Sequence, residues 1–172
     1  MKTNLLFDFE VDKANKTMHI KREFAASLDL VWDAWTKPEL LDKWWAPKPY
    51  RVVTKSMNFK EGGFWHYAMV SPQDEKHWCR ADYQKISEKK SYTYTDAFCD
   101  ENGIINTAVH PGSKWENTFK QNGDTTTVSI TITYKTPEDL EKIVELGFKE
   151  GFTMCIGNLD ELLAEIREKQ TY

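Results

Sequence analysis

The stretch VWDAWTKPELLDKWWAPKPY, residues 31–50, holds four of the seven tryptophans of the chain. Ser27 lies shortly before it, and the apolar residues after Ser27 recur at spacings of three and four, which predicts a capped helix. Pro38 fits the first turn of a second short helix, because the N–H that proline lacks has no partner there. Pro47 and Pro49 end that helix. The stretch therefore predicts two short helices in succession.

The four tryptophans of this stretch are not expected to share one environment. Trp32 and Trp35 lie close to one helical stripe, and Trp32 has a position typical of the core. Trp44 and Trp45 are adjacent, so their side chains diverge by about 100° around a helix. We therefore expect one ring of this pair to point inward and the other to lie at an edge.

Strands are predicted on both sides of these helices. Residues 5–24 alternate apolar and polar side chains around the turn sequence DKANK, which is typical of a hairpin. Residues 50–134 are predicted to form a series of strands separated by polar turns. The clearest pair flanks Asn122 and Gly123, a dipeptide favoured in tight turns, with Thr, Val and Ile alternating after it. Most of the chain is therefore expected to form an antiparallel sheet.

The last segment begins at Pro137 and has apolar residues at helical spacing as far as Ile166. We predict one long amphipathic helix, bent between Gly147 and Gly151. These glycines are expected on one helix face, where they either let the sheet approach closely or keep space for a ligand. Helices grouped on one face of an antiparallel sheet give an α+β fold, and 172 residues suit a single domain, 1–172.

Composition excludes several classes of function. The formal net charge is -4 and the basic residues are scattered, so we expect no nucleic-acid partner. No segment contains the ~20 consecutive apolar residues of a membrane span, and the N-terminus is too polar for a signal peptide. The three cysteines lack a CxxC pair, which indicates free thiols in a reducing compartment. We predict a cytoplasmic protein, either a monomer or a homodimer.

The motifs of common enzymes are missing from the sequence, which contains no GxSxG, P-loop or GxGxxG pattern. The four histidines have no zinc-like spacing. His66 is expected on the outer surface of the sheet, and His110, in a loop, is the best histidine candidate for acid–base chemistry. We therefore predict no metal, no cofactor and no recognised catalytic residue.

Two carboxylates, Asp82 and Asp96, fall on neighbouring predicted strands. A buried carboxylate beside Tyr94 would be a candidate acid or base, because burial raises its pKa toward neutrality. The alternative is that each carboxylate pairs with a basic neighbour such as Arg80, and we favour this alternative.

The stretch REFAASLDLVWDAWTKPELLDKWWAP, residues 22–47, resembles the opening signature of the Aha1-C-like (activator of Hsp90 ATPase homologue 1-like) branch of the START/Bet v 1-like superfamily. KEGGFWHYAMV, YTYTDAF, the Asn-Gly hairpin and the final helix follow in the order of that family. The resemblance covers about residues 16–168 and implies a helix-grip fold, in which a curved antiparallel sheet wraps around a long C-terminal helix. It also implies a cavity between them, where superfamily members commonly bind lipids, hormones or other apolar molecules.

A candidate ligand site follows from the strand alternation combined with this resemblance. A period of two along GGFWHYAMV places Trp65, Tyr67 and Met69 on one face, which the resemblance makes the concave face. Aromatic rings with a few polar tips are typical of a ligand pocket. The predicted ligand-binding residues are Trp35, Trp45, Trp65, Tyr67, Met69, Tyr94, Asp96, Phe98, Trp115, Phe148 and Phe152.

We expect this cavity to bind a small hydrophobic or amphipathic molecule, and no sequence motif indicates an enzyme. One alternative is a cyclase- or hydrolase-like enzyme that uses an inward carboxylate or tyrosine. The other is a protein-interaction module with weak association with an Hsp90-type chaperone. The separate Hsp90-binding region of the eukaryotic co-chaperone has no counterpart in the sequence, so we expect little direct stimulation of Hsp90. A cavity of several hundred Å³ favours the first function, and a filled interior favours the interaction module.

Overall fold

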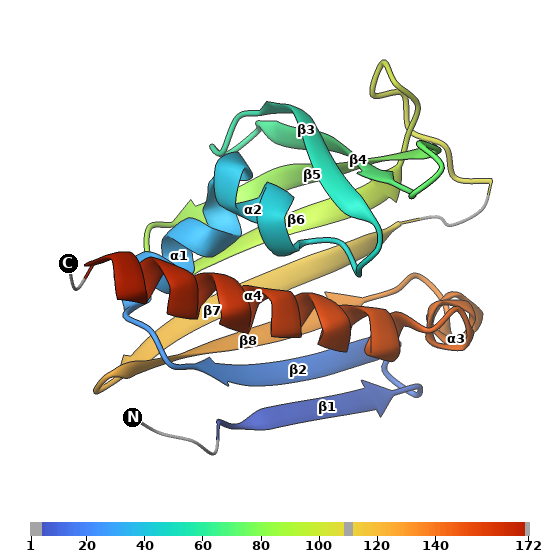
Figure 1. Ribbon diagram of the computed structural model, residues 1–172. Helices are drawn as coiled ribbons and strands as arrows, with labels where there is room; N and C mark the ends of the chain where they lie inside the picture. The colour runs from blue at the N-terminus through green and yellow to red at the C-terminus, as the bar shows by residue number, and fades with distance from the viewer. Residues whose placement is uncertain (1–4, 109–111, 171–172) are drawn as a thin grey trace.

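The computed structural model describes residues 5–108 and 112–170, which form one curved sheet with helices against its concave face (Figure 1). In chain order the elements are β1 (Phe7–Asp12), β2 (Thr17–Phe24), α1 (Leu28–Thr36), α2 (Pro38–Trp44), β3 (Arg51–Met57), β4 (Phe64–Val70), β5 (Lys76–Ser87), β6 (Ser91–Phe98), β7 (Ser113–Asn122), β8 (Thr125–Thr133), α3 (Pro137–Glu145) and α4 (Phe148–Gln170). This arrangement is the predicted α+β helix-grip fold.

The strand order is β1-β2-β8-β7-β6-β5-β4-β3, and each strand is antiparallel to its neighbours. Pairing of β2 with β8 joins the N-terminal hairpin to the last hairpin of the chain. The predicted tight turn is confirmed, because Asn122 pairs with Thr125 and Gly123 adopts a φ of 63°. From Ser113 to Lys120, buried and exposed residues alternate along β7, and the buried residues include Trp115 and Phe119. The buried set faces the helices.

The two short helices form where they were predicted. Ser27 caps α1, since its hydroxyl accepts a hydrogen bond from the backbone N–H of Leu30 (3.3 Å). Pro38 is the first residue of α2, which packs against β3 and α4. In Figure 1, α1 and α2 lie on the same side of the sheet as α4 and away from α3. None of the helices in the described residues is both long enough and apolar enough to cross a membrane.

The tryptophans of these helices divide as expected. Trp32 is 5% exposed and meets the ring of Phe119 with 5.0 Å between ring centroids, so it belongs to the core. Trp44 is 1% exposed, and its Nε1 donates to the carbonyl oxygen of Ala34 (2.9 Å). Trp45, immediately after α2, is half-buried. The adjacent pair therefore diverges, with Trp44 inward and Trp45 at an edge.

The C-terminal segment corrects one prediction, because it forms two helices where one bent helix was expected. Gly147 lies between α3 and α4 with a φ of 88°, in the left-handed region that glycine adopts at helix C-termini. Its N–H donates to the carbonyl oxygen of Val144 (3.1 Å). Since Gly147 lies outside α4, it does not share a helix face with Gly151, and that expectation was wrong.

A second correction concerns the convex face of the sheet, where His66 was expected to be a surface residue. His66 does lie on the face opposite Trp65 and Tyr67, yet it is 4% exposed, because residues 99–106 fold over it. Three backbone carbonyls of this loop accept hydrogen bonds from side chains of the sheet. The three bonds join His66 Nε2 to Asp100 O (3.1 Å), Arg80 Nη1 to Gly103 O (2.7 Å) and Lys55 Nζ to Glu101 O (2.6 Å).

Candidate functional site

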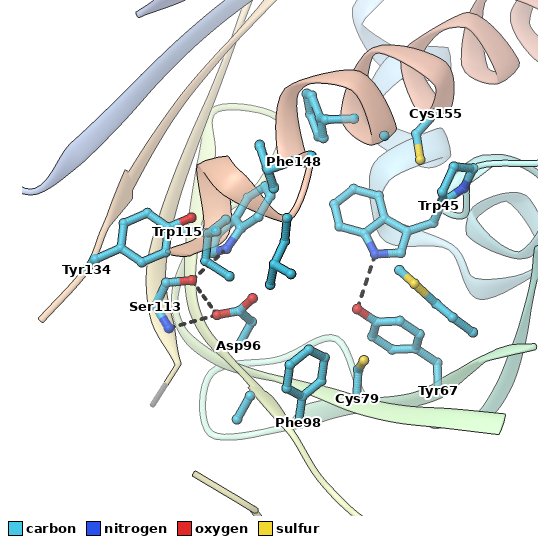
Figure 2. Close-up of a pocket in the computed structure, with 18 residues that line it drawn as sticks. Trp45, Tyr67, Cys79, Asp96, Phe98, Ser113, Trp115, Tyr134, Phe148 and Cys155 are labelled. Atoms are coloured by element: carbon cyan, nitrogen blue, oxygen red, sulfur yellow. Dashed lines mark hydrogen bonds between the residues drawn. The ribbon is translucent and has the colours of Figure 1, made fainter. Parts of the chain in front are cut away.

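A cavity of about 380 Å³ lies between the concave face of the sheet and the junction of α3 with α4 (Figure 2). Strands β4 to β7 supply one wall, and the α3–α4 junction supplies the other. Trp45 and Pro47 border it on the side of α2. Eight of the predicted ligand-binding residues line this cavity: Trp45, Tyr67, Met69, Asp96, Phe98, Trp115, Phe148 and Phe152.

The remaining three predicted residues, Trp35, Trp65 and Tyr94, do not line this cavity. They surround a separate void of about 10 Å³, too small for a ligand. Trp45 lies between the two spaces and lines both of them. Its ring centroid is 5.9 Å from that of Trp35, 6.0 Å from that of Trp65 and 5.9 Å from that of Trp115. Eight of the predicted residues therefore share one cavity, and the indole ring of Trp45 separates the other three from it.

Trp45 is held in this position by a hydrogen bond to the sheet. Its Nε1 donates to the hydroxyl oxygen of Tyr67 (3.2 Å), which projects from β4 toward it (Figure 2). Burial raises the pKa of Tyr67 well above its usual value, and the nearby Cys79 and Asp96 raise it further. The phenol therefore stays neutral at physiological pH and acts as a hydrogen-bonding group.

A second polar group on the wall is the chain of hydrogen bonds at Asp96. Its Oδ1 accepts from the backbone N–H of Ser113 (2.8 Å) and from the hydroxyl of the same residue. The Ser113 Oγ in turn accepts from Nε1 of Trp115 (3.2 Å). Figure 2 shows these three residues side by side on β6 and β7, across the cavity from the Trp45–Tyr67 pair. The arrangement fixes a carboxylate in a mostly apolar wall.

The backbone next to this group requires a glycine. Gly112 has a φ of 96°, and a Cβ built there would lie 2.7 Å from the carbonyl oxygen of Asp96. A side chain at this position would therefore push β6 and β7 apart at the start of their pairing. Because Asp96 pairs with Ser113 in that register, Gly112 helps to hold the carboxylate in place.

The two candidate carboxylates have different surroundings. Asp82 accepts from Nε of Arg80 (2.9 Å) and also from its Nη2, so the predicted ion pair is confirmed for this residue. Asp82 lies on the convex face, because its partner in the register is Phe64. Asp96 faces the cavity, where its Oδ1 accepts from the backbone N–H of Ser113, and the Arg80 named as its candidate partner pairs with Asp82. In the register of β5 with β6, Asp96 pairs with Ala81 and not with Asp82, so the two carboxylates lie on opposite faces of the sheet.

Sequence reasoning did not select two thiols that line the cavity, those of Cys79 and Cys155. Burial raises the pKa of each thiol to about 12, so both are neutral near pH 7. The strand register contained a signal for one of them: Cys79 pairs with Tyr67 on one side and with Phe98 on the other. Tyr67 and Phe98 were both predicted to line the cavity. Cys79 lies between them in the same row across β4, β5 and β6, so it lines the cavity too.

Other lining residues were also missed, because they lie at or just outside the ends of the predicted strands or belong to the α3–α4 junction. Ser113 and Tyr134 lie at the ends of β7 and β8, and burial raises the pKa of the Tyr134 hydroxyl. Ile143 and Leu146 come from α3 and the turn after it. Leu146 is 70% exposed although it lines the cavity, so the opening to solvent has an apolar edge.

The remaining glycine of the predicted pair, Gly151, lines the cavity on α4. A Cβ built there would meet only Pro47, at 4.0 Å, which is ordinary contact. Close approach of the sheet therefore does not explain this glycine, and the alternative of space beside the helix fits the structure. The loop histidine His110 lies outside the described residues. Within residues 5–108 and 112–170, no three His, Cys, Asp or Glu side chains are grouped as a metal site.

The comparisons with known proteins agree with this architecture. A family model described as Activator of Hsp90 ATPase homolog 1-like protein matches residues 25–164. The fold is similar to that of protein Ms6760 from Mycobacterium smegmatis, with 28% identity, a TM-score of 0.83, and 93% of this chain and 97% of that chain covered. A protein from Arthrobacter aurescens has 25% identity and a TM-score of 0.86, with 92% and 91% covered.

At lower identity the likeness concerns the fold alone. The AHSA1 protein from Silicibacter pomeroyi has 17% identity and a TM-score of 0.67, with 86% of this chain and 97% of that chain covered. No curated protein matches the chain.

Proposed function

We propose that the chain, which belongs to the Activator of Hsp90 ATPase homolog 1-like family, binds one small apolar or amphipathic molecule in the cavity between its sheet and α4. The observation that carries this proposal is an apolar-walled space of about 380 Å³. Ligand pockets commonly have volumes of roughly 300–1,000 Å³, with mostly apolar walls and a few placed polar groups. A cytoplasmic location and a monomeric or homodimeric state stay predictions from the sequence.

The walls explain how such a ligand would be held. Aromatic rings of Trp115, Phe148 and Phe152 pack against one another with centroids 5.4–6.2 Å apart. Apolar surface that these rings remove from water contributes about 25 cal/mol per Å². The Trp45–Tyr67 pair and the Asp96–Ser113 pair would then orient the molecule from opposite sides.

The two alternatives have less support. The enzyme alternative assigns proton transfer to an inward carboxylate or tyrosine. Oδ1 of Asp96 is engaged by Ser113, and burial raises the pKa of Tyr67 well above its usual value, so this phenol is not a base near pH 7. A pure interaction module was expected to have a filled interior, and the cavity argues against it.

A pair of substitutions on α4 tests the proposal. Gly151→Leu places a side chain in the cavity, where a Cβ has room beside Pro47. Gly157→Leu is the matched control, because it lies on the same helix, is exposed and has no neighbour within 4 Å of a built Cβ. Both changes improve helix propensity by up to about 1 kcal/mol, so neither is expected to unfold the protein.

Native mass spectrometry of the protein purified from its own host is the measurement. We expect a co-purifying small molecule in the wild type and in Gly157→Leu, and its loss from Gly151→Leu. Equal retention of the molecule by all three proteins would place its binding outside the cavity and refute the proposal.

A further inference from the structure

The side chain of Tyr67 is held rigidly in the cavity wall. Its ring stacks on that of Trp65, with centroids 3.9 Å apart and 21° between the ring planes. Trp65 is fixed in turn, because its Nε1 donates to Oγ1 of Thr54 (3.0 Å) and this hydroxyl donates to Oδ1 of Asp42 (2.6 Å). Tyr67 itself is 6% exposed. A group fixed in this way loses little conformational entropy when it bonds to a ligand.

The hydroxyl of Tyr67 has a proton to donate. Its oxygen accepts from Nε1 of Trp45 (3.2 Å), so its own proton points elsewhere. Among the described residues its other hydrogen-bonding neighbour is Cys79, whose sulfur is a weak acceptor. Burial raises the pKa of Tyr67 well above its usual value, so the proton stays on the oxygen. Donation by Trp45 also polarises the O–H and strengthens it as a donor. An oxygen acceptor on a ligand would therefore meet a good donor.

This donor lies where the polar and apolar parts of the wall meet. Tyr67 lines the cavity from β4, and Figure 2 shows its hydroxyl directed toward Trp45, across the cavity from Asp96. Aromatic surface continues from there, because the ring centroid of Trp45 is 5.9 Å from that of Trp115 and 6.4 Å from that of Phe152. A ligand with its oxygen at Tyr67 would thus place its body against these rings.

Resting on the proposed function, we propose that the ligand of this cavity is an apolar molecule with a carbonyl oxygen, which accepts a hydrogen bond from the hydroxyl of Tyr67. The carbonyl oxygen would lie beside the Trp45–Tyr67 pair, and the apolar body would extend along Trp115 and Phe152. Ketones, aldehydes and esters share this acceptor. A hydrocarbon of the same shape would leave the Tyr67 hydroxyl without an oxygen acceptor, and a hydrogen bond left unmade in a buried site costs affinity.

A ketone and its alkene isostere test this inference: 2-acetylnaphthalene and 2-isopropenylnaphthalene. The two molecules have nearly the same shape, and the second has a C=CH2 group where the first has C=O. Because the alkene is the more apolar of the two, its affinity contains a larger hydrophobic contribution. The ratio of ketone affinity to alkene affinity is therefore compared between proteins, so that this contribution cancels. Isothermal titration calorimetry measures both affinities.

Tyr67→Phe removes the hydroxyl and keeps the ring. In this variant we expect the ratio of ketone affinity to alkene affinity to fall by about threefold to tenfold, the range typical of one neutral hydrogen bond. Tyr83→Phe is the matched control, because it removes the same group from a side chain that is 5% exposed and borders the small void instead of the cavity. The control should leave the ratio unchanged.

The carbonyl group of the bound ketone gives a second readout that does not depend on affinity. A hydrogen bond to a carbonyl oxygen moves the ¹³C signal of the carbonyl carbon downfield. With 2-acetylnaphthalene labelled at this carbon, we expect the signal of the ligand bound to the wild type to lie downfield of its position in cyclohexane. In Tyr67→Phe the signal should move upfield, and in Tyr83→Phe it should stay where it is in the wild type.

The outcomes separate this inference from the proposed function. If either the affinity ratio or the carbonyl signal is the same in the wild type and in Tyr67→Phe, the carbonyl inference is overturned, while binding of the alkene leaves cavity binding in place. An equal fall of the ratio in Tyr83→Phe would assign the effect to loosened packing and also refute the inference. Failure of both probes to bind the wild type at about 1 mM would overturn the inference and count against the proposed function as well.

Discussion

Two ends of the space between sheet and helices are both built from aromatic rings, yet one is closed and the other is hollow. At the closed end, α1 inserts the indole rings of Trp32 and Trp35 against Tyr92 on β6 and Phe119 on β7. At the hollow end the facing element is the α3–α4 junction, where Gly147 and Gly151 have no side chain to insert. The difference shows that the helices, rather than the sheet, decide where the cavity lies.

The sheet contributes similar rows of rings to both ends. Tyr92 and Tyr94 are neighbours on the same face of β6, with ring centroids 5.9 Å apart, and Tyr94 stacks on Trp115 at 5.5 Å. The row therefore continues without interruption from the closed end into the hollow end. Trp45 marks the boundary, because its ring lines both spaces.

Removal of a ring from the closed end is expected to have the largest effect on stability. Trp44→Ala deletes a side chain that is 1% exposed, together with its hydrogen bond to Ala34. We expect the free energy of unfolding to fall by about 3–5 kcal/mol, as for other large-to-small core substitutions. Urea unfolding followed by circular dichroism measures it. A loss below about 1 kcal/mol would show that the closed end is loosely packed.

Removal of the Trp45 ring should open the closed end to the cavity. Trp45→Ala joins the small void near Trp35 and Trp65 to the cavity. Since Trp45 is half-buried, we expect a smaller loss of about 2 kcal/mol. The variant should bind longer apolar molecules than the wild type does, and titration with a series of increasing length measures this change. An unaltered length preference would mean that the sheet rather than Trp45 limits the cavity.

The cavity thiols give the hollow end a distinct dependence on pH. In the folded state the pKa of Cys155 is raised to about 12 by burial, from an ordinary value of 9.0. Above pH 9 the unfolded thiol loses its proton while the folded thiol keeps it, so the stability present below pH 9 is lost as pH rises toward 12. The expected slope is about 1.4 kcal/mol per pH unit for each such thiol.

In Cys155→Ala the free energy of unfolding should fall less steeply above pH 9, by about 1.4 kcal/mol per pH unit, than in the wild type. Between pH 7 and 8 the two proteins should show the same dependence on pH. Urea unfolding at pH 7, 8, 9 and 10 provides the measurement. The same slope in wild type and variant would show that Cys155 is not protected from ionisation by the fold.

The smallest expected effect tests whether Gly151 on α4 leaves room beside the cavity or lets neighbouring groups pack against its backbone. Gly151→Ala and Gly157→Ala each replace a helical glycine, which stabilises a helix by up to about 1 kcal/mol. If Gly151 is kept for space beside the cavity, both variants gain stability to the same extent in thermal denaturation. Destabilisation by Gly151→Ala alone would instead show that its neighbours pack against the bare backbone.

Local patterns in the sequence were sufficient to predict most of the fold. Ser27, Pro38 and the Asn-Gly turn are short-range signals, and each determines its own turn or cap with little help from the rest of the chain. The break at Gly147 was missed because a helical apolar pattern continues across it. His66 was misplaced because alternation gives the face of a strand but not what covers that face.

The sequence also predicted part of the candidate site, since eight of the eleven predicted residues line the cavity. Alternation identified the inward rows that contain Tyr67, Asp96 and Trp115, since it depends only on the period of a strand. It gives no information on position along the strand, so Trp65 and Tyr94 were grouped with residues of the cavity although Trp45 separates them. Residues such as Cys155 and Leu146 belong to the site through the packing of α4 and α3 on the sheet, which is a long-range property.

The indole N–H signals of the tryptophans test the central claim most directly. Trp45 and Trp115 line the cavity, whereas Trp35 and Trp44 lie in the closed end. In two-dimensional ¹H–¹⁵N NMR spectra, addition of a neutral apolar probe, 2-(1-naphthyl)ethanol, should shift the indole signals of Trp45 and Trp115 and leave that of Trp44 unmoved. Equal shifts at both ends, or shifts confined to Trp78 on the convex face, would contradict the assignment of the cavity as the binding site.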